Sequence, residues 1–350
     1  MNFMFLGLNN IEIPSEKYDF IPVGVLPNME MYLISPSCRL TYNGNDMTKV
    51  VDESPIQEDL GKYDWYAMMR KPIIAVWTET EEPELHFKSK EEADKYYTSK
   101  GLLYSDFVMA FTLATWLVKD CCVYSDAYYW CNVDNGYSVK GRRNFQQTNA
   151  RGKMELSAFN QKELDEVFGY LTQILDVFSS TMEKQGADAC GLSYSQGTLI
   201  CDTEAAIKNT GNSFYRMLLL LQLARKTGFL SEKISMYCAM LECLFAIERN
   251  HKRNISEMTA KYVAIDIHER VAIEQDMRDA YGIRSDFVHG DVNVLFDKNE
   301  QLAMLSQRLD DYVRRAARKA FADENCKYEN TRGDRKRIRK YFETMFENVI

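Results

Sequence analysis

Segments typical of β-strands occupy the first 150 residues of this 350-residue chain, and helical periodicity dominates the remainder. The strand-like segments are rich in β-branched and aromatic residues and are bounded by Pro, Gly or Asn: residues 21–26, 31–34, 72–78 and the arms of a hairpin within 124–139, turning at Asp134-Asn135-Gly136. Residues 89–118 have helical spacing with Ser89 as N-cap, and the acidic stretches 52–59 and 79–84 are expected to be loops. This order of elements predicts an α+β protein that begins with a mixed α/β region.

After residue 152, apolar residues recur at spacings of three and four, which is typical of amphipathic helices. Helices are expected at residues 160–185, 203–227, 231–250, 255–266, 268–289, 298–325 and 334–348. A chain of this length is too long for one comfortable hydrophobic core. We therefore expect a mixed α/β sensor or regulatory domain over residues 1–152 and an all-α helical-bundle domain over residues 153–350.

The composition excludes several classes of protein. Hydrophobic residues are 46% and charged residues 27%, which are ordinary globular values. The best apolar run, Met217 to Ala224, falls far short of the ~20 residues that a membrane helix needs. The apolar Met1 to Leu8 lacks the basic residue and the cleavage site of a secretory signal. Together with nine cysteines, an odd number, these features predict a cytoplasmic protein with reduced thiols and no membrane partner.

Familiar motifs for cofactors and metals are missing from the sequence. It contains no G-x-x-x-x-G-K-[ST] or G-x-G-x-x-G phosphate loop and no G-x-S-x-G nucleophile elbow. The cysteines lack C-x-x-C spacing, and the four histidines form no H-x-x-x-H pair. The sequence therefore predicts metal-free chemistry without a cofactor, or no chemistry at all.

The most informative segment runs from Asp279 to Gly290 and contains an R-x4-H pair, Arg284 and His289. Five helical residues advance about 7.5 Å and turn about 140°, so the long Arg284 side chain can swing toward the imidazole. Gly290 is placed to end the helix. His289 then lies in the last turn, where the negative end of the helix dipole favours an imidazolium.

A second clue lies in residues 236–247, where Glu242 is the only charged side chain. A carboxylate on so apolar a helix is costly to bury unless a cation or a hydrogen-bond donor meets it. Arg284 is the candidate partner, because a guanidinium can bind a carboxylate bidentately. Arg284 can equally pair with Asp279 or Asp286, so the sequence leaves its partner open.

These residues carry a resemblance to a known family. An all-helical region that reads L-E-x-L-F at residues 241–245 and Y-x-x-R-S-D-x-V-H-G at residues 281–290 resembles the HEPN superfamily, above all the Apea-like HEPN proteins of bacterial anti-phage defence. The resemblance covers about residues 200–325. It implies a HEPN helical domain and a metal-independent endoribonuclease of abortive infection, with an R-x4-6-H active site commonly formed across a homodimer.

Carried over by position, Arg284 and His289 are the catalytic pair and Glu242 is the acidic residue that orients or supports it. Ser285 stands where the family often has Asn, His or Asp, so Ser285 and Asp286 are both candidates for substrate contact. Arg284 would stabilise the scissile phosphate while His289 moves protons, so that the 2′-OH attacks and a 2′,3′-cyclic phosphate forms. DNA lacks this hydroxyl and would not be cleaved.

The expected partners are an RNA substrate (tRNA or single-stranded RNA), a second copy of the chain and a phage-derived trigger. The formal net charge is −8, yet residues 308–340 hold twelve basic and six acidic side chains. In this stretch Arg335 and Arg337 are expected to contact the RNA backbone. The alternative is an ordinary solvated helix face.

Two further interpretations stay open. The first is a non-catalytic HEPN-type module that binds RNA or a protein, with His289 bonded to a backbone carbonyl at a helix end. The second is a small-molecule enzyme with its pocket in the first 150 residues. The sequence of this region shows no convergent set of polar residues that would support such a pocket.

Overall fold

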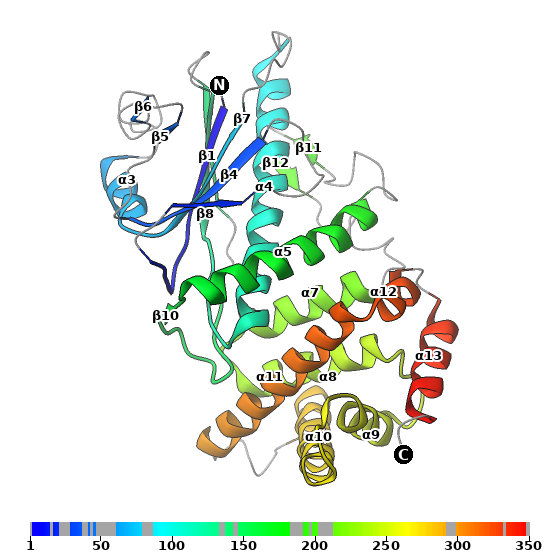
Figure 1. The fold of residues 1–350 in the computed structure, drawn as a ribbon. Coiled ribbons are helices and arrows are strands. Elements are labelled where there is room, and N and C mark those ends of the chain that lie inside the picture. Colours follow the sequence, from blue (N-terminus) through cyan, green and yellow to red (C-terminus); the bar gives the residue numbers. More distant parts are fainter. Residues whose placement is uncertain are drawn as a thin grey trace. The chain divides into compact units, whose positions relative to one another are not determined.

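A computed structural model of the chain describes residues 2–14, 17–20, 29–36, 41–42, 45–46, 61–78, 87–132, 137–142, 146–182, 192–195, 198–201, 213–291, 299–331 and 334–347. The chain forms two compact units (Figure 1). The first consists of residues 1–118, 123–146 and 156–207, and the second of residues 119–122, 147–155 and 208–350. The boundary expected after residue 152 thus falls inside a segment that belongs entirely to the second unit.

The described part of the first unit contains a six-stranded antiparallel sheet with the strand order β3-β4-β7-β1-β8-β9. Its strands are β1 (Asn2–Gly7), β3 (Lys17–Phe20), β4 (Met29–Ile34), β7 (Ile73–Thr78), β8 (Ala127–Asn132) and β9 (Tyr137–Arg142). Met4, Phe5 and Leu6 of the central strand β1 are each at most 1% exposed. The apolar start of the chain is therefore a buried strand, which its continuous hydrophobic run explains.

Most of the expected strands that fall on described residues are present. The segments 31–34 and 72–78 correspond to β4 and β7, and β8 and β9 form the expected hairpin with Asn132 opposite Tyr137. The expected strand at 21–26, the turn at Asp134-Asn135-Gly136 and the acidic stretches 52–59 and 79–84 lie outside the described residues. Further short pairs were not predicted: β2 (Ile11–Glu12) with β10 (Ser157–Ala158), β5 (Thr41–Tyr42) with β6 (Asn45–Asp46), and β11 (Leu192–Ser195) with β12 (Thr198–Cys201).

The helices of the first unit are α3 (Lys62–Met69), α4 (Lys90–Val118) and α5 (Gln161–Met182). The predicted N-cap of α4 is confirmed, because Ser89 Oγ accepts a hydrogen bond from the Glu92 N–H at 3.2 Å. The amphipathic α5 buries its apolar face, including Leu164 and Ile174, and packs against α4. This packing explains why residues 156–207 join the first unit rather than the helical one.

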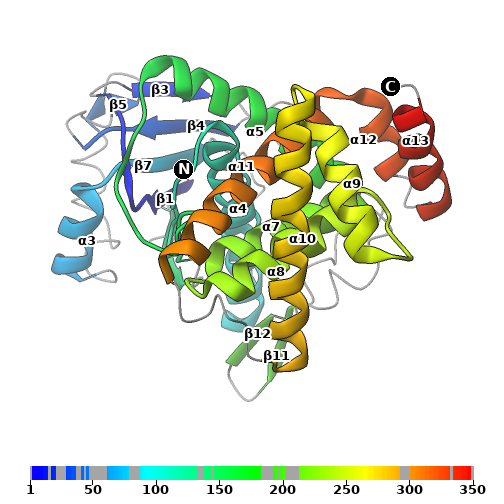
Figure 2. The same ribbon diagram turned by 90° about the horizontal axis from the view of Figure 1, so that it is seen from below.

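Helices are the only regular secondary structure among the described residues of the second unit. It contains α7 (Ser213–Lys226), α8 (Leu230–Leu244), α9 (His251–Val263), α10 (Ile267–His289), α11 (Asn299–Ala322), α12 (Glu324–Thr331) and α13 (Arg335–Glu347). Helix α8 packs against α7, α9, α10 and α11, and Figure 2 shows α8 passing beside α10. The expected α+β class, with a helix-rich second part, is confirmed. None of the described helices is long and apolar enough to cross a membrane.

The sequence predicted a break between two helices after residue 250 and before residue 255, whereas in the structure the break lies between residues 244 and 251. Helix α8 ends at Leu244, and α9 already begins at His251. Between them, Ala246 (φ 53°) and Asn250 (φ 47°) adopt the left-handed region, which turns the chain sharply. The tight reversal brings the start of α9 back to the end of α8. The short α12, which follows α11 directly, was also not expected as a separate helix.

Candidate active site around Glu242

Glu242 lies in the last turn of α8, a helix whose buried side chains are mostly apolar. The expected ion pair is present: Glu242 Oε2 lies 3.1 Å from Arg284 Nη2 of α10. The side chains of Glu242 and Arg284 are only 14% and 27% exposed. The guanidinium therefore compensates a carboxylate that would otherwise be costly to bury.

Tyr281 holds Arg284 from the preceding turn of α10. Arg284 Nη1 donates a hydrogen bond to the Tyr281 hydroxyl at 3.2 Å, and the guanidinium carbon lies 5.1 Å from the centre of the phenol ring. Burial raises the pKa of the Tyr281 phenol, and the adjacent Arg284 partly opposes that rise. Tyr281 is half-buried, and its hydroxyl and ring orient the guanidinium.

His251 is a site residue that the sequence did not reveal. Its Nδ1 lies 3.1 Å from Glu242 Oε1, so the carboxylate bridges His251 on one oxygen and Arg284 on the other. The His251 side chain is 40% exposed. The signal that could have found it is Asn250, a residue type that tolerates the left-handed conformation and often marks a turn.

The thiol of Cys238 lies one turn before Glu242 on α8 and is fully buried. Burial raises its pKa to about 12, and the negative charge of Glu242 contributes further. Cys238 is therefore a neutral thiol at neutral pH and not a nucleophile.

His289 is the last residue of α10, and Gly290 ends the helix as expected, with a φ of 79°. Its side chain is exposed and makes no hydrogen bond or ion pair with another described residue. Five helical residues separate it from Arg284, which rotates its direction by about 140° around the helix axis. The structure thus joins Arg284 to Glu242 but does not join His289 to either of them within one chain.

The residues expected to contact substrate lie in two places. Ser285 and Asp286 are half-buried on α10 next to Arg284, and the Asp286 carbonyl accepts hydrogen bonds from the N–H groups of Gly290 and Asp291. The other two, Arg335 and Arg337, lie in the first turn of α13.

The basic residues of α13 are partly engaged within the second unit. Arg335 Nη2 donates to the Ile247 carbonyl at 3.2 Å, and Arg339 forms an ion pair with Glu248. Arg337 is exposed to solvent. Part of this basic run therefore stabilises the turn after α8.

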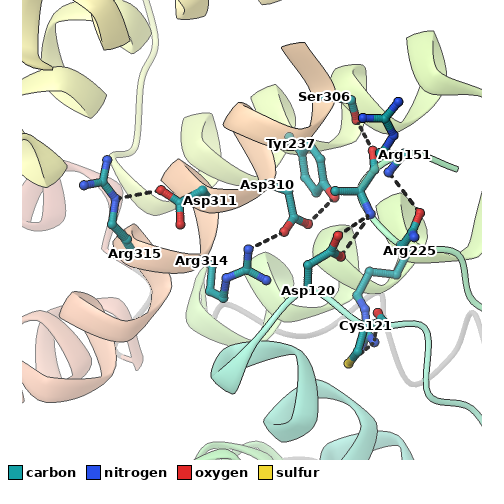
Figure 3. Close-up of polar contacts among 12 residues, drawn as sticks. Asp120, Cys121, Arg151, Arg225, Tyr237, Ser306, Asp310, Asp311, Arg314 and Arg315 are labelled. Carbon is teal, nitrogen blue, oxygen red and sulfur yellow. Dashed lines mark hydrogen bonds and ion pairs between the residues drawn. The ribbon is translucent and has the colours of Figure 1, made fainter. Parts of the chain in front are cut away.

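Figure 3 shows a buried polar network in the second unit that no sequence motif predicted. Tyr237 of α8 donates its hydroxyl to Asp310 Oδ1 of α11 at 2.6 Å, and Arg314 Nη2 lies 2.8 Å from Asp310 Oδ2. The buried Arg225 of α7 donates to the Cys121 carbonyl at 3.2 Å. The network therefore links three helices and a segment from far upstream in the chain.

Hydrogen bonds of this network connect two short segments, 119–122 and 147–155, to each other and to the helices. Both oxygens of Asp120 accept the Ala150 N–H, at 3.0 and 3.2 Å, and Ser306 Oγ of α11 donates to the Ala150 carbonyl at 2.6 Å. Ser306 and Ala150 are 156 residues apart in sequence. Such a pairing leaves no local pattern in the sequence.

Burial in this network shifts the pKa values of Asp120 and Lys233. Burial, and to a smaller extent the charge of Asp310, raises the pKa of Asp120 from 3.8 to about 6. Burial lowers the pKa of Lys233 from 10.5 to about 8, and its ammonium donates to the Ala224 carbonyl at 2.7 Å. These shifts describe a desolvated structural cluster, since its polar groups are directed at one another and at backbone carbonyls.

A separate cavity of about 500 Å³ lies beside α13, and its lining does not include Glu242, Arg284 or His251. Charges of both signs line it: Glu248, Arg249, Lys261, Arg339, Glu343 and Glu347. This balance of charge indicates no ligand class. Within the described residues, no group of three or more His, Cys, Asp or Glu side chains is arranged to hold a metal ion.

Comparison with protein-family models, with curated proteins and with solved structures found no match to this chain, so its function is inferred from the chemistry of its own residues.

Proposed function

We propose that the protein is a metal-independent endoribonuclease of the HEPN type that cleaves RNA, either tRNA or single-stranded RNA. One observation carries the proposal: the buried carboxylate of Glu242 holds Arg284 on the helix that ends at His289. A guanidinium held by a carboxylate and a tyrosine keeps a fixed orientation. It can then present its remaining N–H groups to a phosphate without reorganising.

The chemistry follows from the side chains. Arg284 stabilises the charge that builds on the scissile phosphate as the ribose 2′-OH attacks it. His289, the exposed last residue of α10, donates a proton to the leaving 5′-oxygen. Cleavage gives a 2′,3′-cyclic phosphate and a 5′-hydroxyl.

The cellular role that fits this activity is anti-phage abortive defence in the cytoplasm, switched on by a phage-derived trigger. In this proposal the enzyme acts as a homodimer, as the resemblance implies, and the exposed His289 of each chain completes a shared site. The exposed cation Arg337, on α13, would add contacts to the RNA backbone.

The test is incubation of the purified chain with total tRNA and with a single-stranded RNA in EDTA, with and without phage-infected lysate. Arg284→Ala and His289→Ala are measured in parallel. We expect cleavage that leaves cyclic-phosphate ends and falls by at least about 100-fold in both variants. Cleavage that persists in both variants would overturn the assignment of the site.

A second candidate is a non-catalytic HEPN-type module that binds RNA or a partner protein. The observation that favours it is that Arg284 is already engaged by Glu242 and Tyr281, with His289 apart from all three. This module would bind RNA with the same affinity after His289→Ala and would release no cyclic-phosphate product.

A further inference from the structure

The carboxylate of Glu242 holds two potential catalytic groups rather than one. Arg284 occupies Oε2, and His251 occupies Oε1 at the same distance of 3.1 Å. We infer that His251 is the general base of the site, which takes the proton from the ribose 2′-OH. This inference rests on the proposed ribonuclease function and adds a histidine outside the R-x4-H pair.

The hydrogen bond determines which ring nitrogen of His251 can act. An ionised carboxylate only accepts hydrogen bonds, so the Nδ1 that contacts Glu242 must carry the proton. In the neutral ring the lone pair is then on Nε2. Nε2 has no partner among the described residues, and the side chain is 40% exposed. The ring is therefore oriented to accept a proton from outside the protein.

The charged groups around His251 are compatible with its role as general base. The guanidinium of Arg284 compensates the carboxylate, so Glu242, Arg284 and a neutral His251 sum to zero charge. Glu242 stabilises the imidazolium once the proton has been transferred, as a carboxylate behind a catalytic histidine does.

The step balances without a cofactor. Nε2 of His251 takes the 2′-hydroxyl proton as the 2′-oxygen bonds to phosphorus. The bond from phosphorus to the 5′-oxygen breaks, and that oxygen receives a proton from His289. Exchange with water then restores both imidazoles, since both side chains reach solvent.

The test uses His251→Asn. The Asn amide can place an N–H where Nδ1 donates to Glu242, but it has no group in the position of Nε2. We expect its cleavage rate to fall by about 10²- to 10⁴-fold with the dissociation constant for RNA unchanged. Exogenous imidazole should restore part of the rate to His251→Ala, which shows that this variant folds. The control is His268→Ala, an exposed histidine at the start of α10, which should cleave at the parental rate.

A substrate with a 5′-bridging sulfur separates the base from the acid, because a thiolate leaves without a proton. We expect this substrate to restore cleavage to His289→Ala and not to His251→Asn. Parental cleavage by His251→Asn would overturn the inference and leave the proposed function intact. Restoration of His251→Asn by the sulfur substrate would make His251 the acid and overturn its role as base. A parent chain that cleaves no RNA would overturn the proposed function and His251 with it.

Discussion

Glu242 and Asp120 are carboxylates of the second unit whose surroundings give them different tasks. Glu242 meets a guanidinium and an imidazole, and in the proposed ribonuclease it orients both toward the RNA. Asp120 accepts the Ala150 N–H in a site where desolvation dominates, so its charge is a cost to the fold. The partner that each carboxylate meets thus distinguishes the proposed functional role of Glu242 from the structural role of Asp120.

The raised pKa of Asp120 predicts a pH-dependent contribution to stability. The pKa of this group is about 6 in the folded state against an ordinary value of 3.8, so the folded state binds more protons between these values. The stability it contributes is present at low pH and lost as the pH rises from about 4 to about 6. Asp120→Asn stays neutral throughout. The free energy of unfolding of the variant relative to the parent should therefore increase by about 2 kcal/mol over this window.

Urea denaturation at pH 4.5, 5.5 and 7 measures this difference. Asp279→Asn, an exposed position on α10, is the control and should show a difference that does not change with pH. A flat difference for Asp120→Asn as well would contradict the prediction.

The helix α10 carries Tyr281, Arg284 and His289, and both of its ends are capped. At the start, the Asp266 side chain accepts the Glu269 N–H at 2.8 Å. At the end, Gly290 adopts the left-handed conformation that a residue with a Cβ rarely takes. These caps satisfy backbone N–H and C=O groups at the two ends of the helix that carries Arg284.

Removal of the N-cap by Asp266→Ala should lower the free energy of unfolding by about 1 kcal/mol, because the Glu269 N–H loses its acceptor. Asp279→Ala is the matched control, since it removes an exposed aspartate from the middle of the same helix. That control should change stability by less than about 0.5 kcal/mol. Equal effects of the two substitutions, measured by urea denaturation, would show that the cap contributes nothing.

On the scale of the whole molecule, the second unit is assembled from three separated stretches of chain. The segment 147–155 lies tightly against the turn between α7 and α8: a Cβ on Gly152 would lie 2.5 Å from the Gly228 carbonyl oxygen. This segment and 119–122 provide carbonyl groups to the cations Arg225 and Lys233. The helices therefore depend on residues that precede them by up to 156 positions.

A fragment of residues 153–350 should for this reason fail to fold cooperatively. It keeps the cations Arg225 and Lys233 but loses the Cys121 and Thr148 carbonyls and the carboxylate of Asp120. A buried charge left without its partner costs about 3–5 kcal/mol, a large part of the stability of a domain. Urea denaturation followed by circular dichroism should show a broad transition. A cooperative transition at the midpoint of the full chain would contradict this prediction.

Several elements and their ends could be predicted from local sequence patterns. The strand at 31–34, the cap at Ser89, the helix near 268–289 and its end at Gly290 all follow from periodicity and from residues within a turn of one another. The pairing of Glu242 with Arg284 was within reach, because a lone carboxylate on an apolar helix requires a cation.

Local patterns did not predict three features of the structure: the order of the sheet strands, the membership of 119–122 and 147–155 in the second unit, and the position of His251 beside Glu242. Glu242 is nine residues from His251 and 42 from Arg284 in sequence. Whether such residues meet depends on the path of the chain between them, here on two left-handed residues in the turn after α8. Local patterns specify a helix, whereas the meeting of side chains from different helices is specified by packing of the whole unit.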